Sequence, residues 1–308
     1  MWLTYAILTA LIWGLAELFY KMGSERTTKY TSLRTHVFVG LIMGLHAIYI
    51  MVTQKIEFNV VAINMFYYFP VFFLYMLSMV LSLYGLRYIA DSLSSPVEEA
   101  STAITVLLCF IFLGQTMSRN SAIGVALIII GVILLGIFES KGESKRDPDV
   151  TKKMALVGFF MAISYALLDG VGTFLDAFYL DIEMTPLKFV TEENIELIAN
   201  CAYELSFMIV GILFLIYLLI KKEKFSFKQE KNRIAAATCE MLGQSFYVFA
   251  MSGNAIIAAP IISSVSVIAI ILCRIFLKEE LTWKQYAAIV GVIIGVIILA
   301  IEEVLQEA

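Results

Sequence analysis

The sequence predicts an all-α integral membrane protein with ten transmembrane helices in two related halves. Three observations support this prediction: an apolar composition, ten apolar segments of membrane-spanning length, and an internal repeat. Of the 308 residues, 60% are hydrophobic and 16% are charged, and the mean hydropathy is +0.87. Soluble globular domains carry about 25% charged residues, so this composition indicates the membrane class.

The apolar segments are each close to the roughly 20 residues that a helix needs to cross the hydrocarbon. They are residues 2–22, 33–53, 62–86, 93–115, 120–138, 154–175, 197–220, 233–252, 256–277 and 283–302. No basic region precedes the first segment and its cleavage pattern is weak, so we expect a retained helix rather than a signal peptide. The connections are short and leave no room for a separate soluble domain.

The internal repeat relates residues 93–138 to residues 257–302 at an offset of 164. The matched positions include Pro96 with Pro260, Cys109 with Cys273, Phe112-Leu113 with Phe276-Leu277, and Gly131 with Gly295. A repeat inside a membrane chain is typical of secondary transporters, whose substrate site lies where the halves meet. We therefore divide the chain into a first five-helix repeat (1–140), a basic connection (141–153) and a second repeat (154–308).

The repeated motifs resemble the drug/metabolite transporter superfamily and, more narrowly, its ten-helix EamA-type members. The motifs are Ser95-Pro96, Phe112-Leu113-Gly114-Gln115, Gly124 and Gly131-Val132, repeated as Pro260, Phe276-Leu277-Lys278-Glu279 and Gly295-Val296, with Trp13-Gly14 near the start. The resemblance covers nearly the whole chain. It implies two inverted five-helix repeats, a central cavity, alternating access, and movement of small metabolites such as amino acids or amines.

Two features depart from that family. Gln115 stands where the repeat usually has Glu, so that only Glu279 keeps the carboxylate. The odd-numbered connections hold 19 of the 22 Lys and Arg residues, and the other side holds Lys55, Arg119 and Lys188. By the positive-inside rule, both termini then lie on the non-cytoplasmic side of the plasma (inner) membrane, whereas family members usually have cytoplasmic termini.

Ionisable residues within spanning helices are costly and therefore mark candidate functional sites. This chain has six carboxylates there: Glu17, Glu98, Glu99, Asp169, Glu204 and Glu240. Helix rise places Glu17 and Glu98 towards the odd-numbered connections, Asp169 and Glu204 towards the even-numbered ones, and Glu240 near the midplane. Glu98 and Glu99 are adjacent and point about 100° apart, so both cannot face one cavity squarely.

Aromatic residues accompany two of these acids. At an offset of 152, Trp13 matches Tyr165 and Glu17 matches Asp169, and each ring lies four residues from its acid on one helix face. A ring beside a carboxylate suits an organic cation. Helix three adds aromatic residues from Tyr67 to Tyr75. The candidate substrate-binding residues are Trp13, Glu17, Glu98, Glu99, Tyr165, Asp169, Glu204 and Glu240.

Plainer interpretations stay open for these residues. Glu17 and Lys21 could form an ordinary i,i+4 ion pair, Trp13 and Tyr165 could only pack, and the helix-three rings could face lipid or the core. The acids could also carry protons, because a poorly solvated carboxylate favours its protonated form. The connection 176–196 is acidic, and we leave open whether it is a solvated loop or a cation-attracting vestibule or lid.

The leading prediction is a secondary transporter of a small polar metabolite, most of all an organic cation or amine. One alternative is an amino-acid or multidrug exporter whose acids serve proton coupling only; others are a membrane enzyme, a lipid-handling protein, a sensor or a scaffold.

No HExxH, GxSxG or Asp-rich motif is present, so an enzyme is not expected. No cofactor or metal is expected, since the four cysteines and His36 and His46 form no ligand pattern. The expected partners are a small-molecule substrate, protons and membrane lipid, without nucleic acid. The protein is expected to be a monomer or a homodimer, and Gly291-x-x-x-Gly295 permits close helix approach within the monomer or in a dimer.

Overall fold

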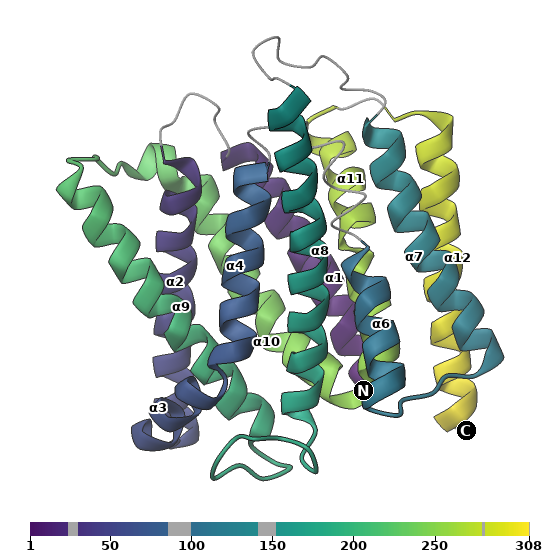
Figure 1. Cartoon of the computed structure of the whole chain (residues 1–308), viewed down its shortest axis with the longest axis horizontal. Coiled ribbons are helices and arrows are strands. Elements are labelled where there is room, and N and C mark those ends of the chain that lie inside the picture. Colours follow the sequence, from purple (N-terminus) through teal and green to yellow (C-terminus); the bar gives the residue numbers. More distant parts are fainter. Residues whose placement is uncertain (24–29, 86–99, 141–151, 279–280, 308) are drawn as a thin grey trace.

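The computed structural model describes residues 1–23, 30–85, 100–140, 152–278 and 281–307, and these residues form helices without any strand. The helices are α1 (Trp2–Gly23), α2 (Thr31–Gln54), α3 (Phe58–Tyr67), α4 (Phe69–Gly85), α6 (Ser101–Phe112), α7 (Arg119–Ser140), α8 (Lys152–Leu180), α9 (Ile195–Ile220), α10 (Phe227–Ser263), α11 (Val265–Phe276) and α12 (Trp283–Glu307). They pack side by side as one bundle (Figure 1). Both chain ends lie at one end of it, which we call the terminal face. The opposite face is where α1 ends and α2 begins.

Five segments of the described chain are long and apolar enough to cross a membrane, and the bent pair α3–α4 would make a sixth. The five are α1, α2, α9, the segment Phe227–Phe276, and α12 as far as Glu302. Phe227–Phe276 has 50 residues, or about 75 Å of helix, enough to cross a hydrocarbon core of about 30 Å twice. It turns at Asn254, whose backbone is non-helical (φ −156°, ψ 80°). This turn confirms the predicted boundary between the eighth and ninth spans.

Two predicted helices are interrupted in the structure. The segment 62–86 consists of α3 and α4, which meet at 61°. Pro70 lies in the first turn of α4, where its missing N–H is tolerated and the preceding helix cannot continue. The segment 256–277 breaks at Ser264, whose hydroxyl donates to the carbonyl of Ile261, as serines at helix bends do.

The break at Asn254 leaves the N–H of Ile256 without its usual helical acceptor. The side-chain oxygen of Gln115 accepts that N–H at 3.0 Å, from the end of the first repeat to the second. The amide at 115, the position where the family usually has Glu, therefore caps a broken helix.

The repeat is visible in the backbone. α6 and α11 each have 12 residues and are offset by 164, and α7 and α12 begin at the same offset. Before them, Ala100 (φ −65°, ψ −12°) matches Ser264 (φ −64°, ψ −2°). After them, Gly114 (φ 60°) matches Lys278 (φ 58°), so one half uses glycine and the other a lysine for the same left-handed turn. α1 runs from the terminal face to the opposite face and α8 runs back, so the halves are inverted (Figure 1).

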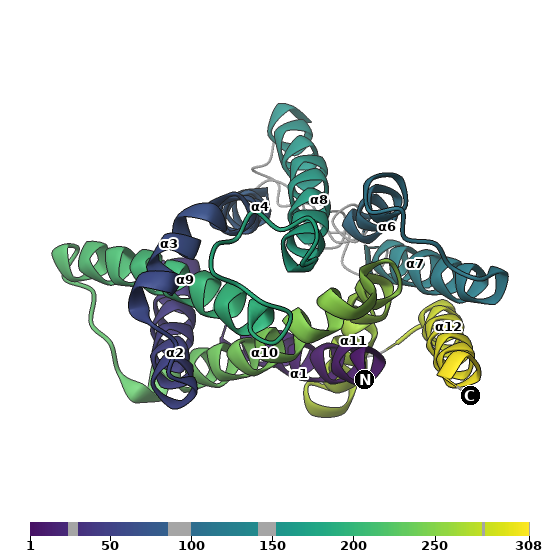
Figure 2. The same cartoon turned by 90° about the horizontal axis from the view of Figure 1, so that it is seen from below.

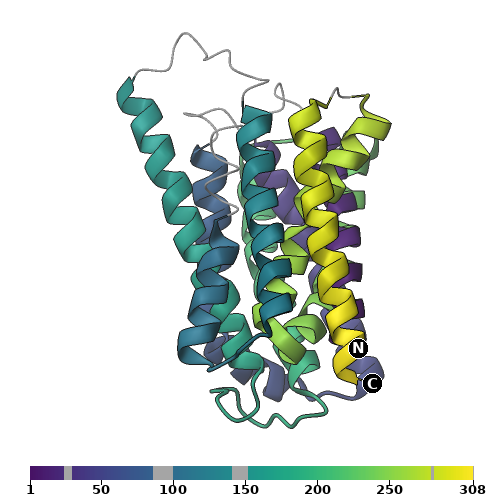
Figure 3. The ribbon, with the colours of Figure 1, turned by 90° about the vertical axis from the view of Figure 1, so that its right-hand side faces the viewer.

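The closest helix pairs join one repeat to the other: α1 with α10, α2 with α9, α4 with α8, and α7 with α12. Figure 3 shows α7 and α12 side by side at one edge. Small residues permit these approaches. A Cβ on Gly40 of α2 would lie 2.4 Å from the carbonyl oxygen of Phe207 on α9, and one on Gly295 would lie 2.7 Å from that of Gly124. Gly295 thus serves packing within the monomer, while a Cβ on Gly291 would meet nothing within 4 Å.

Candidate functional site

Asp169 lies in the middle of the bundle, on the face of α8 that meets α6. Its carboxyl group interacts with the hydroxyl groups of Ser101 on α6 and Tyr165 one turn earlier on α8. The helices approach closely here because residue 170 is glycine: a Cβ there would lie 2.7 Å from the Ser101 carbonyl oxygen. The predicted pairing of Tyr165 with Asp169 on one helix face therefore occurs.

Asp176 is a second carboxylate on α8, seven residues or about 10 Å further along the helix. It is 1% exposed and accepts a hydrogen bond from the hydroxyl of Tyr68, at the bend between α3 and α4. The hydroxyl of Tyr247 on α10 also interacts with it. The prediction that residue 176 begins a connection is wrong, since α8 continues to Leu180. Asp176 is an interior residue, not part of an acidic loop.

Tyrosine hydroxyl groups join α4, α8 and α10 near Thr173, which lies between the two aspartates on α8. Tyr75 of α4 donates to Thr173 of α8 at 3.0 Å, and its oxygen lies 2.8 Å from that of Tyr247. Tyr203 of α9 packs its ring against that of Tyr75, with centroids 6.0 Å apart. Seen from the terminal face, α4 and α8 lie across from α9 and α10 (Figure 2).

The first helix completes this group with a ring and α10 adds a third acid. The Trp13 ring lies 5.3 Å from that of Tyr247, and its indole N–H donates to the carbonyl oxygen of Glu240 at 3.2 Å. The hydroxyl of Tyr20 donates to the Glu240 carboxylate at 3.2 Å. Residue 243 must be small for this, since a Cβ on Gly243 would lie 2.3 Å from the Trp13 ring.

We call this group the interior cluster. It combines three carboxylates with hydroxyl groups and rings from five helices of both repeats. Its members are Trp13, Tyr20, Tyr68, Tyr75, Asp169, Thr173, Asp176, Tyr203, Glu240 and Tyr247. Among the described residues, none of the three carboxylates forms an ion pair with a basic side chain. The cluster thus concentrates acceptors and rings without a fixed cation.

Tyr165 borders the cluster through Asp169, and the remaining predicted acids lie outside it. Glu17 lies on an exposed part of α1, near enough to interact with Glu240 electrostatically. Glu204 faces away from the cluster and pairs with His46 of α2. Glu98 and Glu99 lie outside the described residues. No group of three or more His, Cys, Asp and Glu side chains suited to a metal occurs in the described part of the chain.

Sequence reasoning missed Asp176 and most of the tyrosines of the cluster. One signal was available: Asp169, Thr173 and Asp176 follow the i, i+4, i+7 spacing of a single helix face. Of the aromatic residues from Tyr67 to Tyr75, Tyr68 and Tyr75 point inward, whereas Phe69 and Phe73 are 52% and 47% exposed. The rings of that segment are therefore divided between the interior of the bundle and its surface.

Comparison with known proteins gives the family. The family model described as "EamA-like transporter family" matches residues 1–137 and 156–301. The chain belongs to the EamA-like transporter family. An uncharacterized protein of Methanocaldococcus jannaschii, MJ1333.1, is 30% identical over 150 residues, which span 47% of this chain and 95% of that protein. A solved crystal structure is 11% identical with a TM-score of 0.70, covering 99% of this chain and 98% of that one, which shows the same fold.

Membership of the EamA-like family confirms the predicted architecture of ten transmembrane helices in two inverted repeats. It also makes the protein a multi-pass membrane transporter rather than a member of an enzyme family. In such folds the substrate site lies between the repeats near the middle of the bilayer. The interior cluster draws side chains from α1 and α4 of the first repeat and from α8, α9 and α10 of the second, so it lies between the two repeats of this EamA-like transporter.

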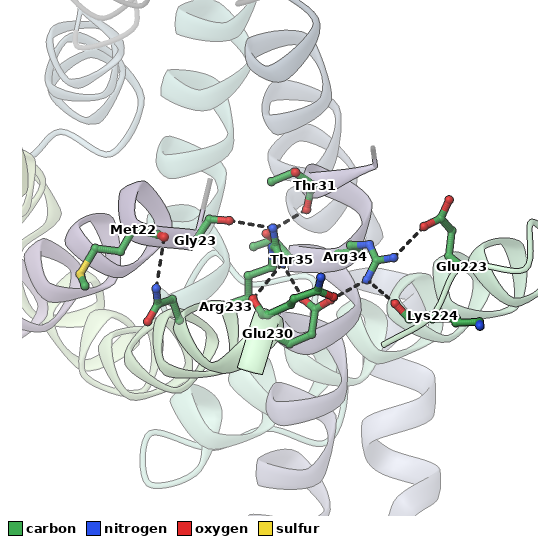
Figure 4. A network of polar contacts seen from close by, with 11 residues as sticks. Met22, Gly23, Thr31, Arg34, Thr35, Glu223, Lys224, Glu230 and Arg233 are labelled. Atoms are coloured by element: carbon green, nitrogen blue, oxygen red, sulfur yellow. Dashed lines mark hydrogen bonds and ion pairs between the residues drawn. The ribbon is translucent and has the colours of Figure 1, made fainter. Parts of the chain in front are cut away.

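A separate ion network joins the repeats at the opposite face of this EamA-like transporter (Figure 4). Glu230 of α10 binds Arg34 of α2 at 2.5 Å and Arg233 of α10 at 2.7 Å, and all three are at most 4% exposed. Arg233 also donates to the carbonyl of Gly23 at the end of α1, at 2.7 Å. Arg34 binds Glu223 at 2.7 Å. The network ties the end of α1 and the start of α2 to the start of α10.

Proposed function

We propose that this transporter moves a small organic cation or amine across the plasma membrane by alternating access, with the interior cluster as its substrate site. The observation that carries the proposal is the set of three interior carboxylates, Asp169, Asp176 and Glu240, which have hydroxyl and ring neighbours but no cationic partner among the described residues. Buried carboxylates without a counter-ion are costly, and a substrate cation would supply the missing charge.

The aromatic residues support a cation rather than an anion or a neutral sugar. The rings of Trp13 and Tyr247 lie together, and the ring of Tyr203 lies beside Tyr75. A cation over a ring face gains about 0.5–2 kcal/mol beyond its attraction to the acids. Tyr and Trp can also accept the apolar part of an amine, so the site suits a cation that carries a hydrophobic group.

The orientation of the chain is part of the proposal. In Figure 1 the described helix ends that flank the odd-numbered connections, such as the end of α1 and the start of α2, lie at the opposite face. By sequence, these connections hold 19 of the 22 basic residues. The positive-inside rule then puts the opposite face in the cytoplasm and both termini outside. A reporter fused to the C-terminus that is active only outside the cytoplasm tests this assignment.

The substrate class is tested by a thermal-shift screen of the purified protein against primary amines, quaternary ammonium ions, amino acids and sugars. Binding to the folded state alone raises the apparent stability by mass action. We expect organic cations to stabilise the wild-type protein, and Asp169→Asn and Asp176→Asn to lose this effect. Glu193→Gln, at an exposed acid of the 181–194 connection, is the matched control and should behave as wild type. Stabilisation by neutral or anionic compounds only would refute the cation site and assign the acids to proton coupling.

A further inference from the structure

One further buried acid lies outside the interior cluster, where it pairs with a histidine. Glu204 of α9 has no exposed surface, and both oxygens of its carboxylate lie 2.9 Å from Nδ1 of His46 on α2. The His46 side chain keeps 18% of its surface exposed. The acid is therefore sealed inside the bundle, while the imidazole reaches towards its surface.

Asn200 adds an independent observation about this pair. Asn200 lies one turn before Glu204 and is 4% exposed. Its Nδ2 donates to Glu204 Oε1 at 3.1 Å. Its Oδ1 is buried and has no hydrogen-bond partner among the described residues. An amide can offer an ionised carboxylate its N–H, or offer a protonated carboxyl group its oxygen. If Glu204 takes up a proton, the amide can turn over and its unpaired oxygen gains a donor. Asn200 thus suits both protonation states of Glu204.

The pair lies where the two repeats meet, since α2 belongs to the first repeat and α9 to the second. The residue before Glu204 is Tyr203, a member of the interior cluster, and neighbouring residues on a helix point about 100° apart. α9 therefore presents Tyr203 to the cluster and Glu204 to α2. Any rotation or shift of α9 that accompanies a change in the cluster also moves Glu204 relative to His46.

Few other titratable groups surround the pair. On α9 the Cys201 thiol lies near Glu204 and donates to the carbonyl of Ala47 on α2. The groups that α4, α8 and α10 direct towards α9 interact with Tyr203 instead; they are Tyr75, Asp169, Asp176 and Glu240. α3, which also packs on α9, has no charged side chain. His46 and Glu204 therefore set the charge of this site.

We infer that His46 and Glu204 form a proton-binding site, distinct from the interior cluster, through which the transporter exchanges a proton for its cation. The inference rests on the proposed function. When paired, protonated His46 and ionised Glu204 are neutral together. Together they hold one proton. A substrate cation that enters the bundle adds one positive charge, which favours release of that proton to water from His46, the partly exposed partner. The pair then carries the single negative charge of Glu204, and His46 takes up a proton again after the cation has left. Substrate and proton then bind at separate acids, and α9 links them.

Proton binding is tested first, on the full chain in detergent. The sequence has only two histidines, so NMR of ring-labelled histidine in His36→Gln reports on His46 alone. We expect its signal to move with pH between about pH 5 and 8, the range in which histidine usually titrates. In Glu204→Gln the midpoint should shift. A His46 signal that does not change over the range in which the protein stays folded overturns the inference.

Coupling is tested by proton release, measured with a pH indicator in weak buffer when phenethylamine or tetraethylammonium is added. We expect about one proton per bound cation from the wild type and none from Glu204→Gln or His46→Gln, while both variants still bind the probe. Glu57→Gln, at an exposed acid before α3, should release protons as the wild type does. Unchanged release from both pair variants overturns the inference and leaves the proposed function standing. If neither probe stabilises the wild type, the proposed function and the coupling fail together.

Discussion

The buried ion network at the opposite face gives the sharpest stability prediction, for Glu230→Gln. Glutamine keeps the shape of the side chain but removes the charge that Arg34 and Arg233 share. Arg34 keeps a second carboxylate in Glu223, whereas the other acceptors of Arg233 among the described residues are carbonyl oxygens, such as that of Gly23. The loss of stability in Glu230→Gln therefore comes mainly from Arg233, which is 2% exposed and loses its carboxylate partner.

Removing one partner of a buried ion pair costs about 3–5 kcal/mol, because the remaining charge is left uncompensated. We expect Glu230→Gln to lower the free energy of unfolding by this amount. Glu223→Gln is the matched control in the same network: its carboxylate is 25% exposed, so the loss should be about 0–1 kcal/mol. Adding Arg233→Met to Glu230→Gln should recover part of the loss, since it removes the stranded charge.

The assay is unfolding of the purified variants by sodium dodecyl sulfate in mixed micelles, followed by tryptophan fluorescence. The order of the two single variants decides the matter. If Glu230→Gln costs no more than Glu223→Gln, burial does not control the strength of these ion pairs and the reasoning is refuted. If the double variant is less stable than Glu230→Gln, Arg233 is not the residue left without a partner.

Two further predictions concern close contacts between the repeats. Gly243→Ala should weaken organic-cation binding and lower the free energy of unfolding by about 1–3 kcal/mol, because a methyl group there would lie 2.3 Å from the Trp13 ring. Gly291→Ala is the control: it has open space around it and should change neither quantity in the same thermal-shift assay. Gln115→Leu should lower the free energy of unfolding in micelles by about 1–3 kcal/mol, because the N–H of Ile256 loses its acceptor. Asn120→Leu, which removes an exposed hydrogen bond to Glu302, should lower it by less. Equal losses at Gln115 and Asn120 would contradict the capping role.

The fold was largely predictable because its signals are local. The membrane-length apolar runs and the repeat at an offset of 164 residues can be recognised in the sequence itself. In the structure the repeat appears as α6 and α11, with matching turns at Gly114 and Lys278. The helix breaks were harder to predict. The bend before Pro70 and the interruption at Ser264 lie inside continuous apolar runs, where hydropathy gives no sign of a change in direction.

The candidate site was predictable only in part. The spacing of Tyr165 and Asp169 along one helix correctly predicts that they meet. The same reasoning grouped Glu204 with Asp169, although α9 directs Glu204 at His46 and Tyr203 at the cluster. Depth in the membrane can be read from position in a helix, but the helix face that meets each neighbour depends on packing between segments far apart in the sequence.

By itself, the sequence determined that this chain is a membrane protein of two inverted repeats with acids inside its spanning helices, because hydrophobicity, length and repetition are properties of the chain. Tertiary structure alone decided which acids share a site. Asp176 enters the interior cluster because α8 continues one turn further than its apolar run and meets the hydroxyl groups of Tyr68 and Tyr247. A buried carboxylate must find hydrogen-bond donors, and those donors come from helices that only the packed bundle brings together.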